Sequence, residues 1–367
     1  MERIKRIKMT EKKKTRPFSF KRTFIIICVV ALSYSLISLV ITKFVYDSQF
    51  PRYERHDESV MAGLRYQDLE DEYPRQLFHF MSGDNRLQGY LYGQNNDQGL
   101  IVLAHGIGGG ADSYLPQITW FVDQGWRVMA YDSTGSFDSE GKSTRGFPQA
   151  LLDLDAALTY VSEQAGLSDL PLLLYGHSWG GYAVTTILHD DHDIRGVISA
   201  AGANSPMEIV LEQGERMMGP LIYLQAPSLW LYQRFLFGSA ASLAADDAIR
   251  AGDTPVMLIH GINDDMVQYK KSAIVASFQA DQPEHVRLLI QDQPGRDGHK
   301  SLFRSDDAIA YIESVNKDYL QLYEAYDQKI PYGEDQDFYA TVDRALAQQL
   351  DETLMQELQA FYLSCLR

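Results

Sequence analysis

The first feature of the chain is an uncharged apolar run close to its N-terminus. No charged residue occurs from Thr23 to Thr42, and residues 24–41 read FIIICVVALSYSLISLVI. Twenty helical residues rise by about 30 Å, which matches the hydrocarbon core of a bilayer. The pattern therefore predicts a transmembrane helix over residues 23–46 that contacts the lipid bilayer.

The residues before this run carry a strong positive charge. Ten of the 33 Lys and Arg residues lie within residues 1–22, beside only Glu2 and Glu11. Positively charged flanks stay in the cytoplasm. We therefore expect a basic cytoplasmic head over residues 1–22, and a single-pass protein of the cell membrane whose remaining chain is extracytoplasmic. A cleaved signal peptide and a buried core helix are the alternatives, but no A-x-A site follows the run, and a core helix needs no cationic flank.

Beyond a polar stretch that predicts a stalk over residues 47–72, the pattern becomes that of a sheet protein. Two strand-like segments flank the turn residues at 83–85. Short apolar runs then alternate with helical periodicity, as in Leu151, Leu154, Leu158 and Val161. The runs cover residues 100–105, 127–132, 170–176, 195–202, 255–261 and 285–291. This alternation predicts a mostly parallel sheet covered on both faces, in a domain over residues 73–327.

Two segments depart from the alternation. Residues 203–254 are too long for a simple crossover and are rich in aromatic and aliphatic residues, so we expect a helical cap over a site; an ordinary packed helix pair is the alternative. In the C-terminal extension, residues 328–367, one apolar stripe predicts a helix docked on the body. The stripe consists of Leu346, Leu350, Leu354, Leu358 and Phe361.

Composition and charge narrow the classes of function. The chain is 45% apolar and 22% charged, which is typical of a globular protein. Of the net charge of −16, the head accounts for +8 and the other 345 residues for −24. An acidic body repels phosphate backbones, so we expect no nucleic-acid partner. The only cysteines, Cys28 and Cys365, exclude a disulfide scaffold and a Cys-rich zinc module.

The strongest chemical signal is a serine motif. Gly176-His177-Ser178-Trp179-Gly180 fits G-x-S-x-G, follows an apolar run, and precedes a helical stretch. In this motif a sharp turn exposes the serine hydroxyl, and the glycines avoid collisions between side chains and backbone. A serine hydroxyl is a poor nucleophile at neutral pH, so Ser178 needs a base and an acid that orients the base.

The sequence here resembles the α/β-hydrolase superfamily, in particular the bacterial serine hydrolases grouped with Ser-aminopeptidase-like and lysophospholipase-like proteins. The resemblance covers about residues 73–312. It rests on the segments AHGIGGG (104–110), GHSWGG (176–181), HGINDDMV (260–267) and GRDGHKS (295–301). It implies the α/β-hydrolase fold, a mostly parallel and doubly covered sheet with a helical cap insertion.

The resemblance also implies the remaining site residues. The acid of the H-G-x-x-D pattern is Asp264, although the adjacent Asp265 stays open as an alternative. The histidine after the last strand is His299, which would act as the base. The backbone N–H groups of Ile107 and Trp179 would form the oxyanion hole. Other histidines of the motifs, among them His177, are expected to support turns.

These residues predict a membrane-anchored serine hydrolase that cleaves a small-molecule or lipid-like carboxylic ester through an acyl-enzyme. A peptidase or amidase with the same triad is the second hypothesis, and a non-catalytic surface module is the third. The chemistry demands no cofactor and no metal. The glycines of residues 106–110 lack the lysine of a phosphate loop, and a solvated helix end explains the loose spacing of His189 and His192.

Overall fold

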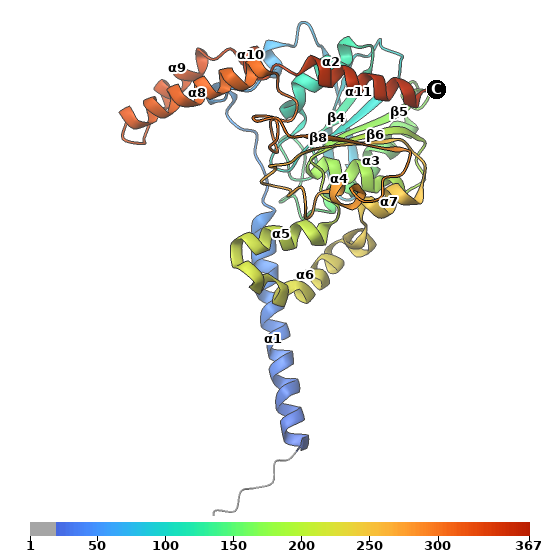
Figure 1. Cartoon of the computed structure of the whole chain (residues 1–367), viewed down its shortest axis with the longest axis vertical. Helices are drawn as coiled ribbons and strands as arrows, with labels where there is room; N and C mark the ends of the chain where they lie inside the picture. Colours follow the sequence, from blue (N-terminus) through green and yellow to red (C-terminus); the bar gives the residue numbers. More distant parts are fainter. Residues whose placement is uncertain (1–19) are drawn as a thin grey trace, which may run out of the picture.

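The computed structural model describes residues 20–367 and shows a long helix leading into a sheet domain (Figure 1). The predicted basic head, residues 1–22, lies almost entirely outside the described residues. The helix, α1, runs from Phe20 to Gln49, three residues beyond each end of the predicted span. Within residues 20–367 it is the one helix long and apolar enough to cross a membrane.

The sheet of the domain has eight strands in the order β1-β2-β4-β3-β5-β6-β7-β8. The strands are β1 Arg75–Ser82, β2 Asn85–Tyr92, β3 Leu100–Ala104, β4 Arg127–Tyr131, β5 Leu172–His177, β6 Ile194–Ala200, β7 Val256–Gly261 and β8 Val286–Gln291. The first two strands form the predicted hairpin, in which Ser82 pairs with Asn85, and β2 also pairs antiparallel to β4. All other pairs are parallel, as the alternating pattern predicts.

Helices cover both faces of this sheet, which confirms the predicted α/β architecture. On one face lie α2 (Leu115–Asp123) and α11 (Glu352–Cys365). The other face packs against α3 (Gln149–Glu163), α4 (Trp179–Thr186) and α7 (Ala245–Ala251). All five residues of β3 are buried, as expected for a central strand with helices on both sides.

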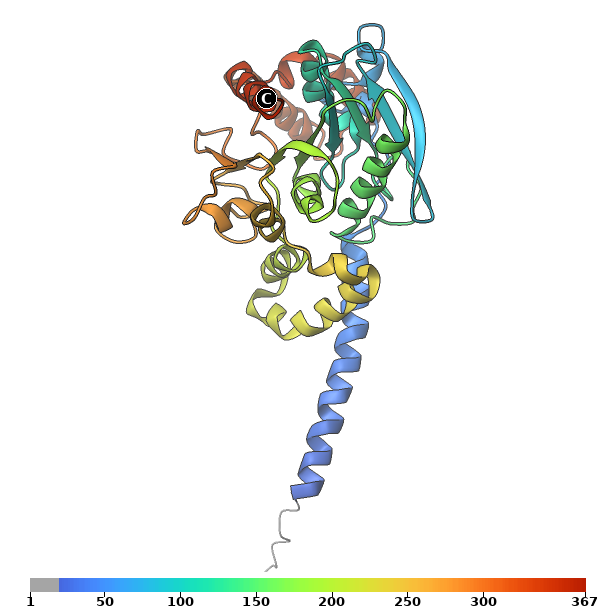
Figure 2. The same ribbon diagram turned by 90° about the vertical axis from the view of Figure 1, so that its right-hand side faces the viewer.

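The segment predicted as a cap contains three helices in two different environments. Helices α5 (Pro206–Met218) and α6 (Ile222–Phe237) lie beside α1, at the end of the domain from which α1 extends (Figure 2). The third helix, α7, buries Ala245 and Ile249 in the core of the domain. We therefore use the word cap for residues 206–237 only.

The C-terminal extension is helical, but its apolar stripe does not form one helix. It comprises α9 (Tyr332–Ala340), α10 (Arg344–Ala347) and α11, and it follows α8 (Asp306–Ala325), the last helix of the predicted domain. The prediction of a single helix through Leu346 and Leu350 is wrong. Leu350 lies in the short segment between α10 and α11, where it forms a β-bridge with Arg304. The docking of α11 is confirmed, since its Leu354, Leu358 and Phe361 side chains are buried.

Residues 50–72, predicted as part of a stalk, lie against the domain. The Arg52 guanidinium donates hydrogen bonds to the carbonyls of Phe137, Ser139 and Gly141, at 2.6–3.0 Å. The Tyr53 N–H donates to the Gly135 carbonyl at 2.9 Å. Only two single-turn 3₁₀ helices follow, at residues 58–60 and 66–68. The end of α1 is thus fixed to the sheet domain within a few residues.

Candidate active site

Ser178 occupies a sharp turn between β5 and α4. Its backbone has φ +57° and ψ −111°, a conformation that residues other than glycine rarely adopt. Strained residues of this kind persist where the surrounding structure holds them, and they occur preferentially at functional sites. The turn lies at the carboxyl end of a central parallel strand, where ligands bind in open α/β sheets.

Two glycines make this turn possible by allowing the backbone to approach closely. A Cβ atom on Gly176 would lie 2.3 Å from the Gly180 carbonyl oxygen, and one on Gly180 would lie 2.0 Å from the Ala104 carbonyl oxygen. Real Cβ atoms essentially never come so close to backbone. The glycines of the serine motif are therefore required by the packing of α4 against β5 and β3.

We predict that Gly180→Ala destabilises the protein by about 3 kcal/mol or more, because α4 must shift to admit the methyl group. The matched control is Gly333→Ala in α9, where a Cβ meets nothing within 4 Å. That change should not destabilise the protein, because the added methyl group meets no neighbour and alanine favours a helix more than glycine does. Urea unfolding of the full chain in detergent measures both. Equal midpoints for the two variants would contradict the packing argument.

The structure brings the three side chains of the predicted triad together. The imidazole Nε2 of His299 lies 2.9 Å from the Ser178 Oγ, and its Nδ1 lies 2.7 Å from the Asp264 Oδ2. Asp264 and His299 follow β7 and β8, so three loops at the carboxyl ends of parallel strands meet here. Asp264 is buried, whereas the adjacent Asp265 is exposed to solvent. The geometry thus favours Asp264 as the partner of the imidazole.

The Asp264 carboxylate is held by its own loop. Its Oδ1 accepts hydrogen bonds from the backbone N–H groups of Met266 and Val267, both at 2.8 Å. Burial raises the pKa of Asp264, but the hydrogen bond and charge of His299, together with the Val267 N–H, outweigh burial. The pKa of Asp264 therefore lies below its usual value, and the group is ionised at neutral pH.

A partly buried series of hydrogen bonds connects the loop at Gly106 with the loop that carries His299. Burial, followed by the charge of His299, lowers the pKa of His177 to about 3, so its imidazole is neutral at neutral pH. Its Nε2 lies 2.9 Å from the His299 carbonyl and its Nδ1 lies 2.8 Å from the Tyr114 hydroxyl, which accepts from the Gly106 N–H at 2.9 Å. We assign Nε2 as the donor because a carbonyl can only accept. His177 therefore positions His299 as well as supporting its turn.

Sequence reasoning missed Tyr114, and it gave His177 only a turn-supporting role. The histidine is part of the serine motif, but Tyr114 lies in a separate 3₁₀ segment, residues 111–114, with no motif of its own. No pattern in the sequence pairs these two residues.

Both residues predicted for the oxyanion hole lie at the site. Among the hydrogen bonds of residues 20–367, neither the Ile107 nor the Trp179 backbone N–H has an acceptor. Trp179 is the first residue of α4, where an N–H has no partner within the helix. The Ile107 loop is fixed by the Gly106 hydrogen bond to Tyr114. Two backbone donors are thus available beside Ser178.

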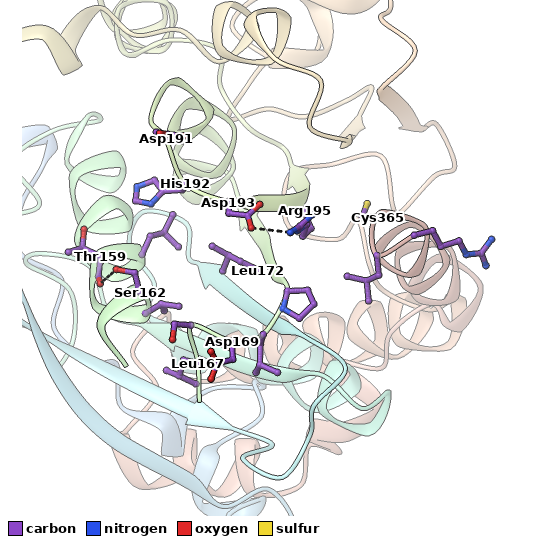
Figure 3. Close-up of a pocket in the computed structure, with 17 residues that line it drawn as sticks. Thr159, Ser162, Leu167, Asp169, Leu172, Asp191, His192, Asp193, Arg195 and Cys365 are labelled. Carbon is purple, nitrogen blue, oxygen red and sulfur yellow. Dashed lines mark hydrogen bonds and ion pairs between the residues drawn. The ribbon is translucent and has the colours of Figure 1, made fainter. Parts of the chain in front are cut away.

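A pocket of about 420 Å³ opens at Ser178. Its walls come from the Ile107 loop, from the cap, and from the last turns of α1. A larger hollow, of about 790 Å³, lies at the opposite ends of the strands, near the starts of β5 and β6 (Figure 3). There His192 contacts Asp155 at 2.9 Å, and within residues 20–367 no three acidic, His or Cys side chains gather as metal ligands. Of the two cavities, only the pocket at Ser178 is lined by predicted site residues, Ser178 and Ile107.

Comparisons with known proteins agree with this architecture. Residues 95–246 match the family model described as serine aminopeptidase, S33. An esterase of Pyrococcus furiosus superposes on the chain with a TM-score of 0.51 at 17% identity, over 77% of this chain and 99% of that one. The chain has the α/β-hydrolase fold.

Curated relatives match only part of the chain. The quorum-quenching protein AidA of Acinetobacter baumannii is 29% identical over 130 residues, which are 33% of this chain and 41% of that protein. The polyketide transferase af380 of Aspergillus fumigatus is 27% identical over 116 residues, which are 31% of this chain and 40% of that protein. The chain therefore spans about two fifths of the length of these curated relatives.

Proposed function

We propose that this α/β-hydrolase is a serine hydrolase that cleaves carboxylic esters at Ser178 while α1 anchors it in a membrane. The proposal rests above all on the hydrogen-bonded series of Ser178, His299 and Asp264, with distances of 2.9 and 2.7 Å. This series supplies a nucleophile, a base and an acid that orients the base.

In the proposed reaction, the Ser178 Oγ attacks the ester carbonyl carbon as His299 Nε2 takes the hydroxyl proton. The oxyanion of the tetrahedral intermediate accepts hydrogen bonds from the Ile107 and Trp179 N–H groups. His299 then gives its proton to the leaving alcohol, and an acyl-Ser178 intermediate remains. A water molecule, deprotonated by His299, then attacks the acyl carbon, and His299 returns that proton to the Ser178 Oγ as the bond to the acyl group breaks and the carboxylic acid is released. Asp264 stabilises the imidazolium that forms in each half of the reaction.

The lining of the Ser178 pocket favours an ester over an aminoacyl amide. The amine of such an amide would need a free acidic group, and the candidates are Glu208, Glu212 and Glu215. Glu212 is buried and accepts from Gln268 and Ser272, while Glu215 pairs with Lys271. None of the three lines the pocket at Ser178. This supports the ester reaction over the peptidase alternative.

The character of α1 supports the proposed anchoring. Its apolar side chains between residues 24 and 37 are mostly exposed, which is unfavourable in water but suits a lipid environment. The cationic residues before it favour a cytoplasmic N-terminus and an extracytoplasmic hydrolase domain.

A fluorophosphonate probe on the full chain in detergent micelles tests the proposed function. The wild type should be labelled covalently, and Ser178→Ala should not. An unlabelled wild type, or equal labelling of both proteins, would overturn the serine hydrolase. Comparison of kcat/KM for a short acyl ester and an aminoacyl amide then separates esterase from peptidase. A faster amide reaction would favour the peptidase.

A further inference from the structure

The anchor helix forms part of the wall of the Ser178 pocket. Ile41, Thr42, Val45 and Tyr46 of α1 line the pocket, facing α5 and α6 of the cap. Cap residues that line the same space include Ile209, Met217, Ile222 and Leu229. The pocket is therefore closed on one side by the helix that, under the proposed function, leaves the bilayer. Any ligand of Ser178 lies between the anchor and the cap.

Hydrogen bonds fix the height of the cap along α1. The Tyr34 hydroxyl donates to the Leu224 carbonyl at 2.9 Å, and Ser38 Oγ lies 2.6 Å from Ser228 Oγ. Nearer the end of α1, the Tyr232 hydroxyl donates to Asp47 at 2.7 Å. Helix α6 thus begins beside the middle of the uncharged run and rises along α1 (Figure 2).

This height places part of the cap at the depth of the lipid. The uncharged run ends at Thr42, eight residues after Tyr34. Eight helical residues rise by about 12 Å. If the run spans the hydrocarbon core, Leu224 lies below the outer edge of that core. The cap and the outer leaflet then occupy the same layer.

The outer surface of the cap has the composition that this depth requires. Residues 217–233 contain no charged residue. Several large apolar side chains of this surface are exposed: Met217, Leu221, Tyr223, Leu224, Trp230, Leu231 and, just beyond, Phe235. Phe235 is 81% exposed and Leu224 61%. Arg216 and Arg234 flank the uncharged stretch, where guanidinium groups would reach the lipid headgroups. Contiguous apolar surface of this kind marks an interaction site.

We propose that the cap inserts into the outer leaflet beside α1, and that the Ser178 pocket takes the acyl chain of a membrane-resident long-chain ester directly from the bilayer. The inference deepens the proposed function and rests on it. A long acyl chain would pass from lipid to apolar pocket walls without crossing water, which avoids the cost of hydrating its methylene groups. The occupant of the apolar cap surface is thus lipid.

Tryptophan fluorescence tests the insertion of the cap without any hydrolysis. Of the four tryptophans, Trp230 on the cap is 52% exposed, Trp126 and Trp179 are fully buried, and Trp120 lies on α2, where its indole N–H donates to Glu352. In vesicles whose acyl chains carry bromine, a quencher, we expect the full chain to lose at least one fifth of its emission. Trp230→Phe should abolish that loss, and Leu224→Trp in this variant should restore it. Equal quenching of the wild type and Trp230→Phe, or none, would overturn insertion; a second copy of the chain covering the cap would give no quenching.

Acyl-chain selectivity tests the pocket. The substrates are p-nitrophenyl palmitate dissolved in the vesicles and p-nitrophenyl butyrate in water. We expect Val45→Trp, in the pocket wall, to lower the palmitate-to-butyrate rate ratio at least tenfold. Phe44→Trp, next in sequence, is the matched control because Phe44 is 70% exposed and does not line the pocket. Its ratio should match that of the wild type.

The two proposals fail differently. A wild type that hydrolyses butyrate but not palmitate, or equal ratios for Val45→Trp and Phe44→Trp, would overturn the lipid pocket and leave the serine hydrolase intact. Absence of fluorophosphonate labelling and of all ester hydrolysis would overturn the proposed function, and the lipid substrate with it.

Discussion

Replacing His299 by glutamine should lower kcat/KM for a short ester by about 10⁵–10⁶-fold and abolish fluorophosphonate labelling of Ser178. The imidazole Nε2 lies 2.9 Å from the serine oxygen, and no other described basic side chain is hydrogen-bonded to that oxygen. Without a base, the hydroxyl stays protonated at neutral pH and attacks poorly. Steady-state kinetics in detergent, together with probe labelling, measures the loss.

The matched control for this substitution is His79→Gln on β1. His79 is exposed on the edge strand and contacts nothing in the site. Its variant should keep wild-type kinetics. A His299→Gln protein that retains more than a hundredth of the wild-type rate would contradict the assignment of His299 as the base.

Replacing Asp264 by asparagine should lower kcat by about 10⁴-fold. The asparagine amide has the shape of the carboxylate, but it does not carry the charge that stabilises the imidazolium. It can also donate toward His299 Nδ1 and hold the imidazole in the wrong tautomer. In the variant, the amide oxygen of the asparagine can accept the hydrogen bonds that the Met266 and Val267 N–H groups donate to Asp264 Oδ1, so the loop should remain folded.

The neighbouring carboxylate provides an internal control. Asp265 is exposed, and the hydrogen bond to His299 Nδ1 comes from Asp264, so Asp265→Asn should change kcat less than twofold. Measurement of kcat for both variants decides between the two acids that the motif leaves open. A larger loss in Asp265→Asn than in Asp264→Asn would reverse the assignment.

The sheet could be predicted because parallel strands buried on both faces appear in the sequence as short apolar runs between helical segments. All six predicted runs from residue 100 onward overlap β3 to β8. The break between α10 and α11 could not be predicted in this way. Leu350 keeps the leucine spacing although it pairs with Arg304, because a bridge residue and a helix residue can both be apolar.

The serine of the candidate site could be predicted because the nucleophile and the glycines that its turn requires lie next to one another in the sequence. Ser178 needs its flanking glycines for a steric reason, so the motif marks the turn itself. The link from Tyr114 through His177 to His299 depends on which loops meet after folding, and sequence spacing carries no such information. The packing of α1 on the cap was equally hidden, because a helix that is apolar on all sides has no face that indicates its neighbour.

The hydrogen bonds of Arg52 and Tyr53 to the loop at residues 135–141 join the end of α1 to the sheet domain. Under the proposed anchoring, we expect these hydrogen bonds to keep the domain from swinging about the end of α1, and so to hold the mouth of the Ser178 pocket at one height and one tilt. Under the proposed anchoring, hydrolysis is confined to the leaflet in which the protein itself sits. Esters of an opposing membrane become substrates only after transfer into that leaflet, and a flexible insertion between residues 49 and 52 should relax this restriction.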